Sequence, residues 1–490
     1  MEGYIVSLII FTAVFALFSL GLNLQWGFTG LINFGHVAFM VVGSYLVVIL
    51  TTQGYLKAIP AQMLEQFTWM QRTPLARLLP ALGDVLPAQV PWGVALLLGA
   101  IAAALLGLIM GLATLRLRED YLAIVTIGMA EVLRLVAVNE QWLTRGTFGI
   151  QQFPLPLSQL QPNALLRLTM IAVLTTIVGL GLWRLWRWAR RQIKGAPLAA
   201  LLRGLAAVMA YLGLLGLALA GALWSIQAID GALGSVVGSA LGSALEQSVA
   251  RSGAFGWGLS LVLLGLVGLV GWLFARLGRQ GARLSAWAEA VALTAALAIA
   301  AAGLWIYGYA ASAVYYYDRN PTKTGLMWLC VVIAAATYAI LQRLVNSPWG
   351  RVLKAIREDE QVARALGKNT FWYKLQSLML GGAIAGVAGA LYAWQLTTVY
   401  PDNFRPLETF NAWTIVVLGG AGSNAGTLLG ATLFWTYQTL TRFTLEDVVP
   451  LSSAQLGAFR VMVIGLLLMV MMIWRPQGVL GRKEELTLDR

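Results

Sequence analysis

The sequence predicts an all-α polytopic membrane protein of about 11–12 spans, with some segments that glycine breaks or turns back within the membrane. Its 490 residues are 59% hydrophobic and only 11% charged, too few charges to cover the surface of a soluble protein. Apolar runs of about twenty residues recur, a length that crosses a bilayer as a helix that satisfies its own backbone hydrogen bonds. The sequence GGAGSNAG at 419–426 interrupts one such run.

Hydropathy places the individual spans. The N-terminus, MEGYIVSLIIF, lacks the basic region of a cleaved signal and is interpreted as a retained helix. The interrupted stretch 410–441 is predicted to dip into the membrane and return to the same side, because a broken membrane segment persists only where protein or a cavity surrounds it. The other spans are predicted at 4–22, 30–50, 92–115, 120–138, 166–186, 198–224, 256–275, 286–311, 325–345, 375–396 and 457–474.

Basic residues alternate between the loops and predict the orientation. Loops 116–118, 184–194, 276–283 and 343–374, with the segment after Trp474, carry 21 Lys and Arg residues. Loops 51–91, 139–165, 225–255, 312–324, 397–409 and 442–456 carry 9. The positive-inside rule therefore places the first set and the C-terminus in the cytoplasm, and leaves the side of the N-terminus open. This bias accounts for the net charge of +13 without a nucleic-acid partner.

The sequence argues against catalysis within the chain. Its single cysteine, Cys330, excludes an intrachain disulfide, and its single histidine argues against a histidine-rich metal site. Gly367-Lys368 is followed by Asn369 and has Val362 where a phosphate loop requires glycine. We therefore expect no catalytic residue, no metal and no cofactor, and hydrolysis of any ATP by another subunit.

Four segments and a closing motif resemble the LivM-type permeases of branched-chain and neutral amino-acid ABC importers. The order and spacing of these segments agree with that family, and the third segment is the most specific. They are GLNLQWGFTGLINFGHVAFMVVGSYL (21–46), TLRLREDYLAIVTIGMAEVLRLV (114–136), SPWGRVLKAIREDEQVARALGKNTFWYKLQSLMLGGAIAGVAGALYA (347–393), VVLGGAGSNAGTLLGA (416–431) and WRPQGVLG (474–481).

The resemblance implies the transmembrane domain of an ABC importer in a bacterial inner membrane, moving neutral amino acids inward by alternating access. It implies four partners: two cytoplasmic ABC ATPase subunits, a second related permease, and a periplasmic substrate-binding protein. Residues 1–162 and 313–490 would be the two halves of the permease core. Residues 163–312 look inserted, with four additional spans and few polar residues, which favours a peripheral addition.

The loop 347–374 is the strongest functional candidate. Helix-forming residues from about 349 to 368 end at Gly367, which predicts a short amphipathic helix able to dock into a partner. The resemblance implies that this is the coupling helix, in which Glu360, Ala363 and Gly367 match the family pattern, and in which Arg357, Glu358 and Glu360 would orient the ATPase. An ordinary interfacial helix is the alternative. The predicted apolar stripe consists of Val352, Ala355, Ile356, Val362, Ala363 and Leu366.

Asn33, Gly35 and His36 form the first candidate pathway segment. Polar side chains within an apolar run are costly unless they have partners or a function, and glycine lets the backbone present polar groups to a zwitterionic solute. The alternative for His36 is a hydrogen-bonded packing residue.

Two further groups are pathway candidates. Glu131 and Arg134 lie three residues apart on one predicted helix face, as a structural ion pair or as gating or substrate-facing residues, and Thr126 is a candidate by a similar argument. Gly419, Gly420, Gly422 and Gly426 either border the pathway or are close-packing points between helices.

Three other functions remain open. Permeases of urea importers also resemble this chain, so urea or a short amide is an alternative substrate. A secondary transporter independent of ATPase subunits is disfavoured by the mostly uncharged spans and by the docking-type helix. A structural membrane protein would not need glycine-broken segments.

Overall fold

The computed structural model describes residues 2–67, 73, 80–81, 86–117, 119–192, 303–448, 453–474 and 478–480. The chain divides into two compact units, one of Met1–Leu174 and Tyr309–Arg490 and one of Thr175–Gly308. The predicted spans 198–224 and 256–275, and most of 286–311, lie outside the described residues. In the second unit, the hydroxyl groups of Thr175 and Tyr307 lie 2.6 Å apart.

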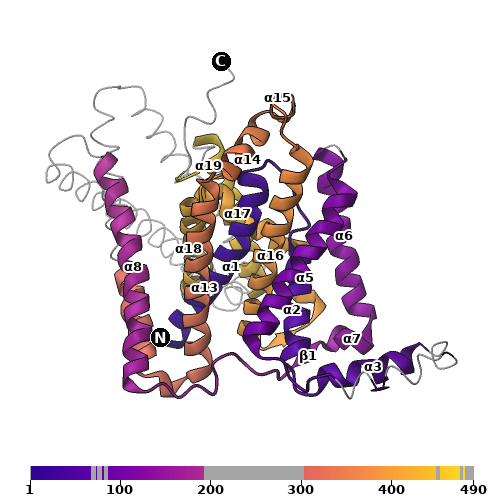
Figure 1. The fold of residues 1–490 in the computed structure, drawn as a ribbon. Coiled ribbons are helices and arrows are strands. Elements are labelled where there is room, and N and C mark those ends of the chain that lie inside the picture. Colours follow the sequence, from indigo (N-terminus) through magenta and orange to yellow (C-terminus); the bar gives the residue numbers. More distant parts are fainter. Residues whose placement is uncertain are drawn as a thin grey trace, which may run out of the picture. The chain divides into compact units, whose positions relative to one another are not determined.

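The described part of the first unit is built almost entirely from helices (Figure 1). The π-helical turn η1 (Asn23–Gly27) directly continues α1 (Glu2–Leu22), and α8 (Ala164–Gln192) begins in this unit and ends in the second. The short strands β1 (Ile150–Gln151) and β2 (Thr398–Val399) pair antiparallel. The other helices are α2 (Val37–Thr51), α3 (Tyr55–Gln66), α5 (Trp92–Thr114), α6 (Glu119–Asn139), α7 (Gln141–Thr144), α13 (Pro321–Val345), α14 (Pro348–Glu358), α15 (Glu360–Ala365), α16 (Thr370–Leu396), α17 (Pro406–Gly419), α18 (Asn424–Val448) and α19 (Ser453–Trp474).

Six helices in the described residues are long and apolar enough to cross a membrane, or up to eight spans if each of two bent pairs counts as one. The bent pairs are α2 with α3, at 108°, and 401–419 with 424–439, at 117°. The prediction of an all-α polytopic membrane protein with interrupted segments is therefore confirmed.

The segment predicted as a span at 30–50 differs from the structure in its first part. Residues 28–36 are not helical, and α2 begins only at Val37. Gly30 has a φ of +79°, which glycine adopts without strain. Polar side chains elsewhere in the chain bond the freed backbone groups, and they replace the helical hydrogen bonds expected from hydropathy. The predicted outer loop 51–91 also contains a helix, α3.

Helix α16 packs against α1, α2 and α5 through glycines (Figure 1). A Cβ atom added at Gly43 of α2 would lie 2.1 Å from the carbonyl oxygen of Gly386 in α16. One added at Gly389 would lie 2.2 Å from the carbonyl oxygen of Met40. Close backbone approach at small residues is the usual way in which membrane helices pack.

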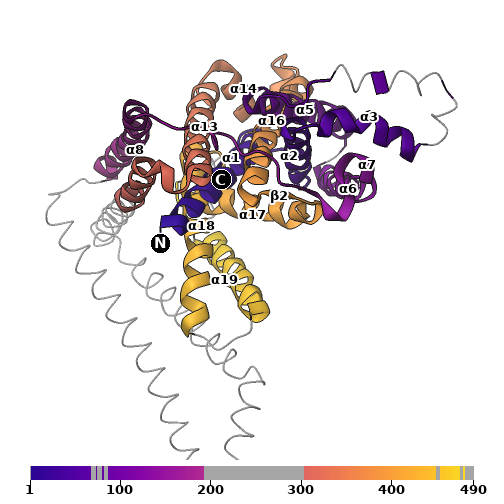
Figure 2. The same cartoon turned by 90° about the horizontal axis from the view of Figure 1, so that it is seen from below.

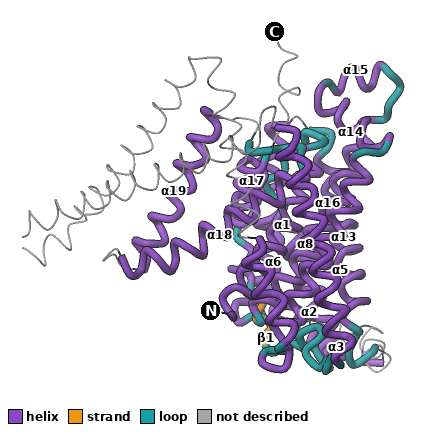
Figure 3. Tube along the Cα trace, turned by 90° about the vertical axis from the view of Figure 1, so that its left-hand side faces the viewer, coloured by secondary structure: helices purple, strands orange, loops and turns teal. Residues whose placement is uncertain are grey.

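The two ends of the first unit carry different elements. Helices α14 and α15 and the junction of α5 with α6 lie at one end, and β1, α3, α7 and the N-terminus lie at the other (Figures 1 and 3). The side chain of Gln395, next to β2, donates to the hydroxyl of Ser7 in α1 at 3.4 Å, which ties the N-terminal part of α1 to that end. Helices α18 and α19 extend to one side of the group that α1, α2, α5, α13 and α16 form (Figure 2).

Candidate functional site

The two interrupted segments meet at the end of α1. The buried side chain of Asn23 in η1 accepts a hydrogen bond from the backbone N–H of Gly422 at 2.9 Å. Its amide donates to Oδ1 of Asn424 at 3.2 Å, and Asn424 is also buried. One asparagine therefore joins the π turn to the break between α17 and α18.

Asn33 holds the non-helical segment 28–36 in place. Its amide donates to Oε1 of Gln25 in η1 at 2.9 Å, and its Oδ1 accepts from the N–H of Gly35 at 2.9 Å. Its backbone carbonyl accepts from the indole N–H of Trp413 in α17 at 3.2 Å. Because a buried polar group without a partner costs about 1–3 kcal/mol, this network is what makes a non-helical segment tolerable here.

Thr126 and Gly35, singled out separately in the sequence, lie together. The hydroxyl of Thr126 in α6 accepts from the N–H of Phe34 at 3.2 Å. A Cβ atom added at Gly35 would lie 1.9 Å from the carbonyl oxygen of Thr126. Only glycine allows the segment to approach α6 this closely.

His36 is fully buried and has a structural contact. Its Nε2 lies 3.1 Å from the carbonyl oxygen of Phe18 in α1, and the two rings are 4.8 Å apart between centroids. Among the described residues, Nδ1 has no hydrogen-bond partner. This geometry is that of a hydrogen-bonded packing residue, and a transport role for His36 stays a prediction.

The ion pair predicted between Glu131 and Arg134 is confirmed and belongs to a larger group. Arg134 Nη2 lies 2.6 Å from Oε1 of Glu131, and Nη1 lies 3.1 Å from Oδ1 of Asp402 in the 3-10 turn Pro401–Phe404. Arg405 contacts the same Asp402 carboxylate at 3.3 Å. The side chain of Arg134 is only 19% exposed, so these carboxylates neutralise a cation that is largely removed from solvent.

The glycines at 419–426 divide into two structural roles. Gly420 and Gly422 have φ values of +113° and +78°, which a side chain disfavours, and they form the break that follows α17. A Cβ atom added at Gly419 would lie 2.0 Å from the carbonyl oxygen of Gly426, so these two are close-packing points. The N–H groups of Val479 and Leu480 bond the last carbonyls of α17, so residues 478–480 of the closing motif pack onto the break.

The single helix predicted over about 349–368 is two helices in the structure. Helix α14 ends at Glu358, and α15 begins at Glu360. Between them Asp359 has extended backbone (φ −155°, ψ 109°), and its carboxylate accepts from the N–H groups of Gln361 and Val362 at 2.8 and 3.0 Å. The aspartate caps a new helix in preference to continuing the old one.

The prediction that the apolar residues of this loop form one continuous docking stripe was wrong. Ile356 and Ala363 are buried within this chain, whereas Val362 and Leu366 are 54% and 73% exposed. The break at Asp359 turns α15 relative to α14, so residues at helical spacing across it no longer share a face.

Glu360 anchors α15 to the start of α16. Its carboxylate lies 2.5 Å from Nζ of Lys374 and 2.7 Å from Nη2 of Arg364, and accepts from the Thr370 hydroxyl at 2.9 Å. Burial alone would raise the pKa of Glu360, but these donors outweigh it and hold the pKa below its ordinary value. The carboxylate is therefore ionised at neutral pH and makes charge-assisted contacts within the chain.

Gly367 ends α15 in a left-handed conformation, with a φ of +77°. Its N–H bonds the carbonyl of Arg364 at 2.9 Å, and the N–H of Lys368 bonds that of Ala363 at 3.2 Å. This pair of bonds is the Schellman motif, in which glycine is preferred because it has no Cβ atom.

This geometry predicts different effects for two substitutions at Gly367. A Cβ atom there meets nothing within 4 Å, so any effect comes from the backbone. Gly367→Val should destabilise the end of α15 by about 1–2 kcal/mol, whereas Gly367→Asn should stay near wild type because asparagine tolerates this conformation. Limited proteolysis of the loop 359–369 in membranes measures the difference. Equal cleavage rates in the two variants would contradict the assignment.

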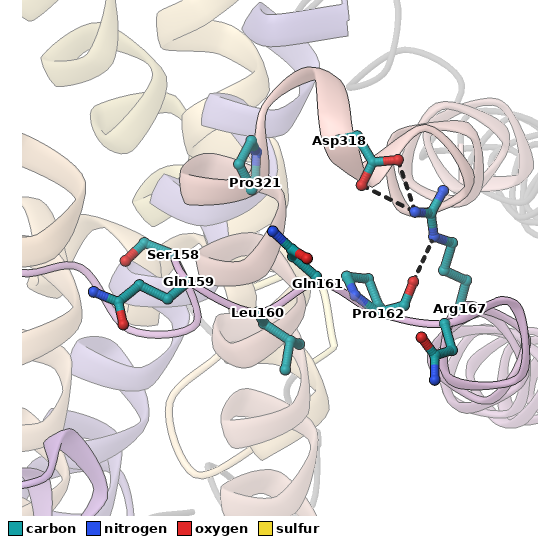
Figure 4. A pocket seen from close by; sticks show the side chains of 9 residues that line it. Ser158, Gln159, Leu160, Gln161, Pro162, Arg167, Asp318 and Pro321 are labelled. Carbon is teal, nitrogen blue, oxygen red and sulfur yellow. Dashed lines mark hydrogen bonds and ion pairs between the residues drawn. The ribbon is translucent and has the colours of Figure 1, made fainter.

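A surface pocket at the β-sheet end of the first unit lies apart from this site (Figure 4). Arg167 donates to both carboxylate oxygens of Asp318, at 2.9 and 2.7 Å, and to the carbonyl of Pro162 at 3.0 Å. The arginine and the carboxylate that line the pocket therefore neutralise each other. None of the site residues predicted from the sequence lines it.

Two residues that connect the parts of the site were not predicted from the sequence. Asn23 and Gln25 in η1 supply the hydrogen bonds to both interrupted segments, and Gln25 also donates to the carbonyl of Leu378 in α16 at 3.2 Å. The sequence signal that could have identified them is the presence of two amide side chains, two residues apart, inside the apolar run GLNLQWG. Among the described residues, no group of three or more His, Cys, Asp or Glu side chains could hold a metal ion.

Comparison with known proteins identifies a family. The chain is 28% identical over 166 residues to the probable branched-chain amino acid transport permease protein LivM of Methanocaldococcus jannaschii, covering 33% of this chain and 47% of that protein. It is 34% identical over 164 residues to the high-affinity LivM permease of Escherichia coli, covering 34% of this chain and 36% of that protein. It is 30% identical over 183 residues to the LivH permease of Salmonella typhimurium, covering 37% of this chain and 54% of that protein.

These matches span about half or less of the relatives' own length. No solved structure matches the chain. The family model described as the permease component of branched-chain amino acid transport systems matches residues 4–190 and 199–472, nearly the whole sequence. Together with its interrupted helices and multiple spans, this match shows that the chain belongs to the family of branched-chain amino acid transport permeases, which are membrane components and not enzymes.

Proposed function

We propose that this chain moves a branched-chain or other neutral amino acid inward across a bacterial inner membrane by alternating access, with energy from ATP hydrolysed on separate subunits. The observation that carries the proposal is the meeting of two interrupted membrane segments at the end of α1, held by Asn23 and Gln25. Interrupted helices place backbone polar groups inside the membrane, where transporters bind polar solutes.

The pathway is proposed to border these segments. Asn33, Gly35 and Thr126 shape the first segment, and Gly419, Gly420 and Gly422 shape the second. His36 packs against α1 next to the first segment, and the Glu131–Arg134 group lies in the C-terminal half of α6. The side chains of His36, Glu131 and Arg134 make their contacts within the protein. We therefore propose that these residues shape the pathway and do not bind the solute directly.

Four partners follow from this function: two cytoplasmic ABC ATPase subunits, a related permease and a periplasmic binding protein. Similarity to both LivM and LivH proteins supports pairing with a second permease of the same family. The ATPase is proposed to contact the exposed side of α14 and α15, which includes Glu358, Val362 and Leu366.

The end that carries α14 and α15 is proposed to be cytoplasmic, with the C-terminus on the same side. Within the first unit, the described loops of the two charge classes lie at opposite ends (Figure 1), which supports the positive-inside assignment. In Cys330→Ala protein, an impermeant thiol reagent added to intact cells should label a cysteine at position 65 or 318 and spare one at position 358 or 368. The reverse labelling pattern would invert the orientation.

Radiolabelled uptake tests the function directly. Cells that lack this chain should lose ATP-dependent uptake of leucine, isoleucine and valine, and the restored gene should return it. Uptake of urea or a short amide in place of amino acids would replace the substrate assignment. Uptake that persists without the ATPase subunits would support a secondary transporter.

A further inference from the structure

Helix α14 contacts the π turn η1 and the residues that follow it on one side. The guanidinium of Arg357 donates to the backbone carbonyl of Gly27, the last residue of the turn. Gly30 lies against the same arginine, since an added Cβ atom would be 3.5 Å from its Cγ. The ammonium group of Lys354 lies 5.9 Å from the ring centroid of Phe28.

Apolar side chains also pack α14 tightly against η1. Leu353 of α14 is fully buried, in one cluster with Leu24 of η1 and with Phe28. The same cluster contains Leu20 of α1 and Leu341 and Val345 of α13. A displacement of α14 therefore has to displace the end of α1, because close-packed side chains transmit rather than absorb movement.

The other side of the turn holds both interrupted segments. Asn23 bonds Gly422 and Asn424 at the break between α17 and α18, and Gln25 bonds Asn33 in the segment 28–36. Contact with the break is close, since a Cβ atom added at Gly27 would lie 2.5 Å from the backbone nitrogen of Gly422. The five-residue turn η1 thus contacts α14 as well as both breaks.

A π turn is suited to movement. Its hydrogen bonds reach one residue further along the chain than those of an α-helix, and it occurs as short insertions, often at functional sites. Its hydrogen-bond pattern lies one register away from that of α1, so the turn and the α-helix are two discrete arrangements of the same residues. Discrete packing alternatives are what convert small shifts into larger rearrangements.

We propose that η1 relays movement of α14 to both interrupted segments, with Arg357 and Asn23 as the positioning residues on its two sides. This inference rests on the proposed function, in which the α14–α15 region contacts the ATPase. It gives Arg357 a role within its own chain, through the hydrogen bond to Gly27, where the sequence predicted an orienting charge towards the ATPase.

The test uses the complete transporter, reconstituted in liposomes with its partner permease, ATPases and binding protein. The measured quantities are ATPase co-purification, ATP hydrolysis and [3H]leucine transported per ATP. Arg357→Gln and Asn23→Ala should each keep co-purification and hydrolysis within about two-fold of wild type. Each should lower the leucine transported per ATP by about five-fold or more.

The double variant separates a relay from two independent defects. If both residues act through η1, the double variant should be no worse than the more severe single variant, whereas independent effects would multiply. Lys57→Gln, which removes a positive charge from an exposed position of α3 at the opposite end of the unit (Figure 1), is the control and should transport like wild type. If Asn23→Ala does not assemble, Asn424→Ala removes the same side-chain hydrogen bond from the other partner.

Each outcome decides between alternatives. Loss of ATPase co-purification in Arg357→Gln would make Arg357 a docking residue and overturn the relay. Multiplying effects in the double variant, or unchanged transport in both single variants, would also overturn it and leave the proposed function intact. Absence of ATP-dependent leucine uptake in the wild-type complex would instead overturn the proposed function, and the relay with it.

Discussion

The Glu360→Lys variant should insert and assemble in the membrane yet lose ATP-driven leucine uptake by about ten-fold or more, a change worth about 1.4 kcal/mol. Glu360 is the shared acceptor for Lys374, Arg364 and Thr370. A lysine in its place would bring three cations together and remove the acceptor that all three donors share. Helix α15 would then separate from α16, at the surface proposed to meet the ATPase.

Two comparisons locate the defect. Glu65→Lys makes the same charge change on α3, at the opposite end of the unit, and should transport like wild type. Glu358→Lys changes an exposed carboxylate of the same loop and should weaken ATPase co-purification without loosening α15. Uptake in detergent-free vesicles and ATPase retention on affinity resin measure the two effects. If Glu360→Lys keeps both wild-type uptake and wild-type ATPase retention, the loop 347–374 does not couple the ATPase to transport.

Local signals in the sequence predicted several features correctly. Hydropathy located the long spans, because a bilayer imposes both length and apolar composition on each helix. The glycines at 419–426 predicted the break after α17, and the spacing of Glu131 and Arg134 predicted their ion pair. Each of these signals depends on residues that are neighbours in the chain.

Features that depend on distant partners could not be predicted in this way. Residues 28–36 are apolar enough for a helix, but Thr126 and Trp413 stabilise their non-helical form from far along the chain. The loop 347–374 has helix-forming residues throughout, yet the carboxylate of Asp359 caps a second helix and divides it. Helix propensity is a weak preference beside two hydrogen bonds to backbone N–H groups.

The dependence on distant partners also explains why Asn23 and Gln25 were not predicted as site residues. Asn23 and Gln25 lie between the predicted spans 4–22 and 30–50, in a stretch to which hydropathy assigned no span. Their importance lies in contacts with Asn424 and Asn33, which hydropathy does not report. The polar amides were visible in the sequence, but their partners were not.

The close approach of α2 and α16 gives the largest expected effect on stability. Gly43→Ala should prevent the native packing of these helices, because its Cβ atom would lie 2.1 Å from the Gly386 carbonyl oxygen and 2.4 Å from the Gly386 Cα. Both atoms belong to the backbone, so no side-chain rotation relieves the overlap. Overpacking of this kind costs about 1–3 kcal/mol, and more where the backbone of a buried helix has to move.

Gly128→Ala in α6 is the matched control, since a Cβ atom there meets nothing within 4 Å. Alanine is the better helix former by about 1 kcal/mol, so this variant should be as stable as wild type or slightly more so. Thermal unfolding of the detergent-solubilised proteins, followed by size-exclusion chromatography, should show a lower Tm for Gly43→Ala and an unchanged or higher one for Gly128→Ala. Identical Tm values for the two variants would show that α2 and α16 do not pack at Gly43. The arrangement of the central helices would then have to be revised, because α16 packs against α1, α2 and α5 through its glycines.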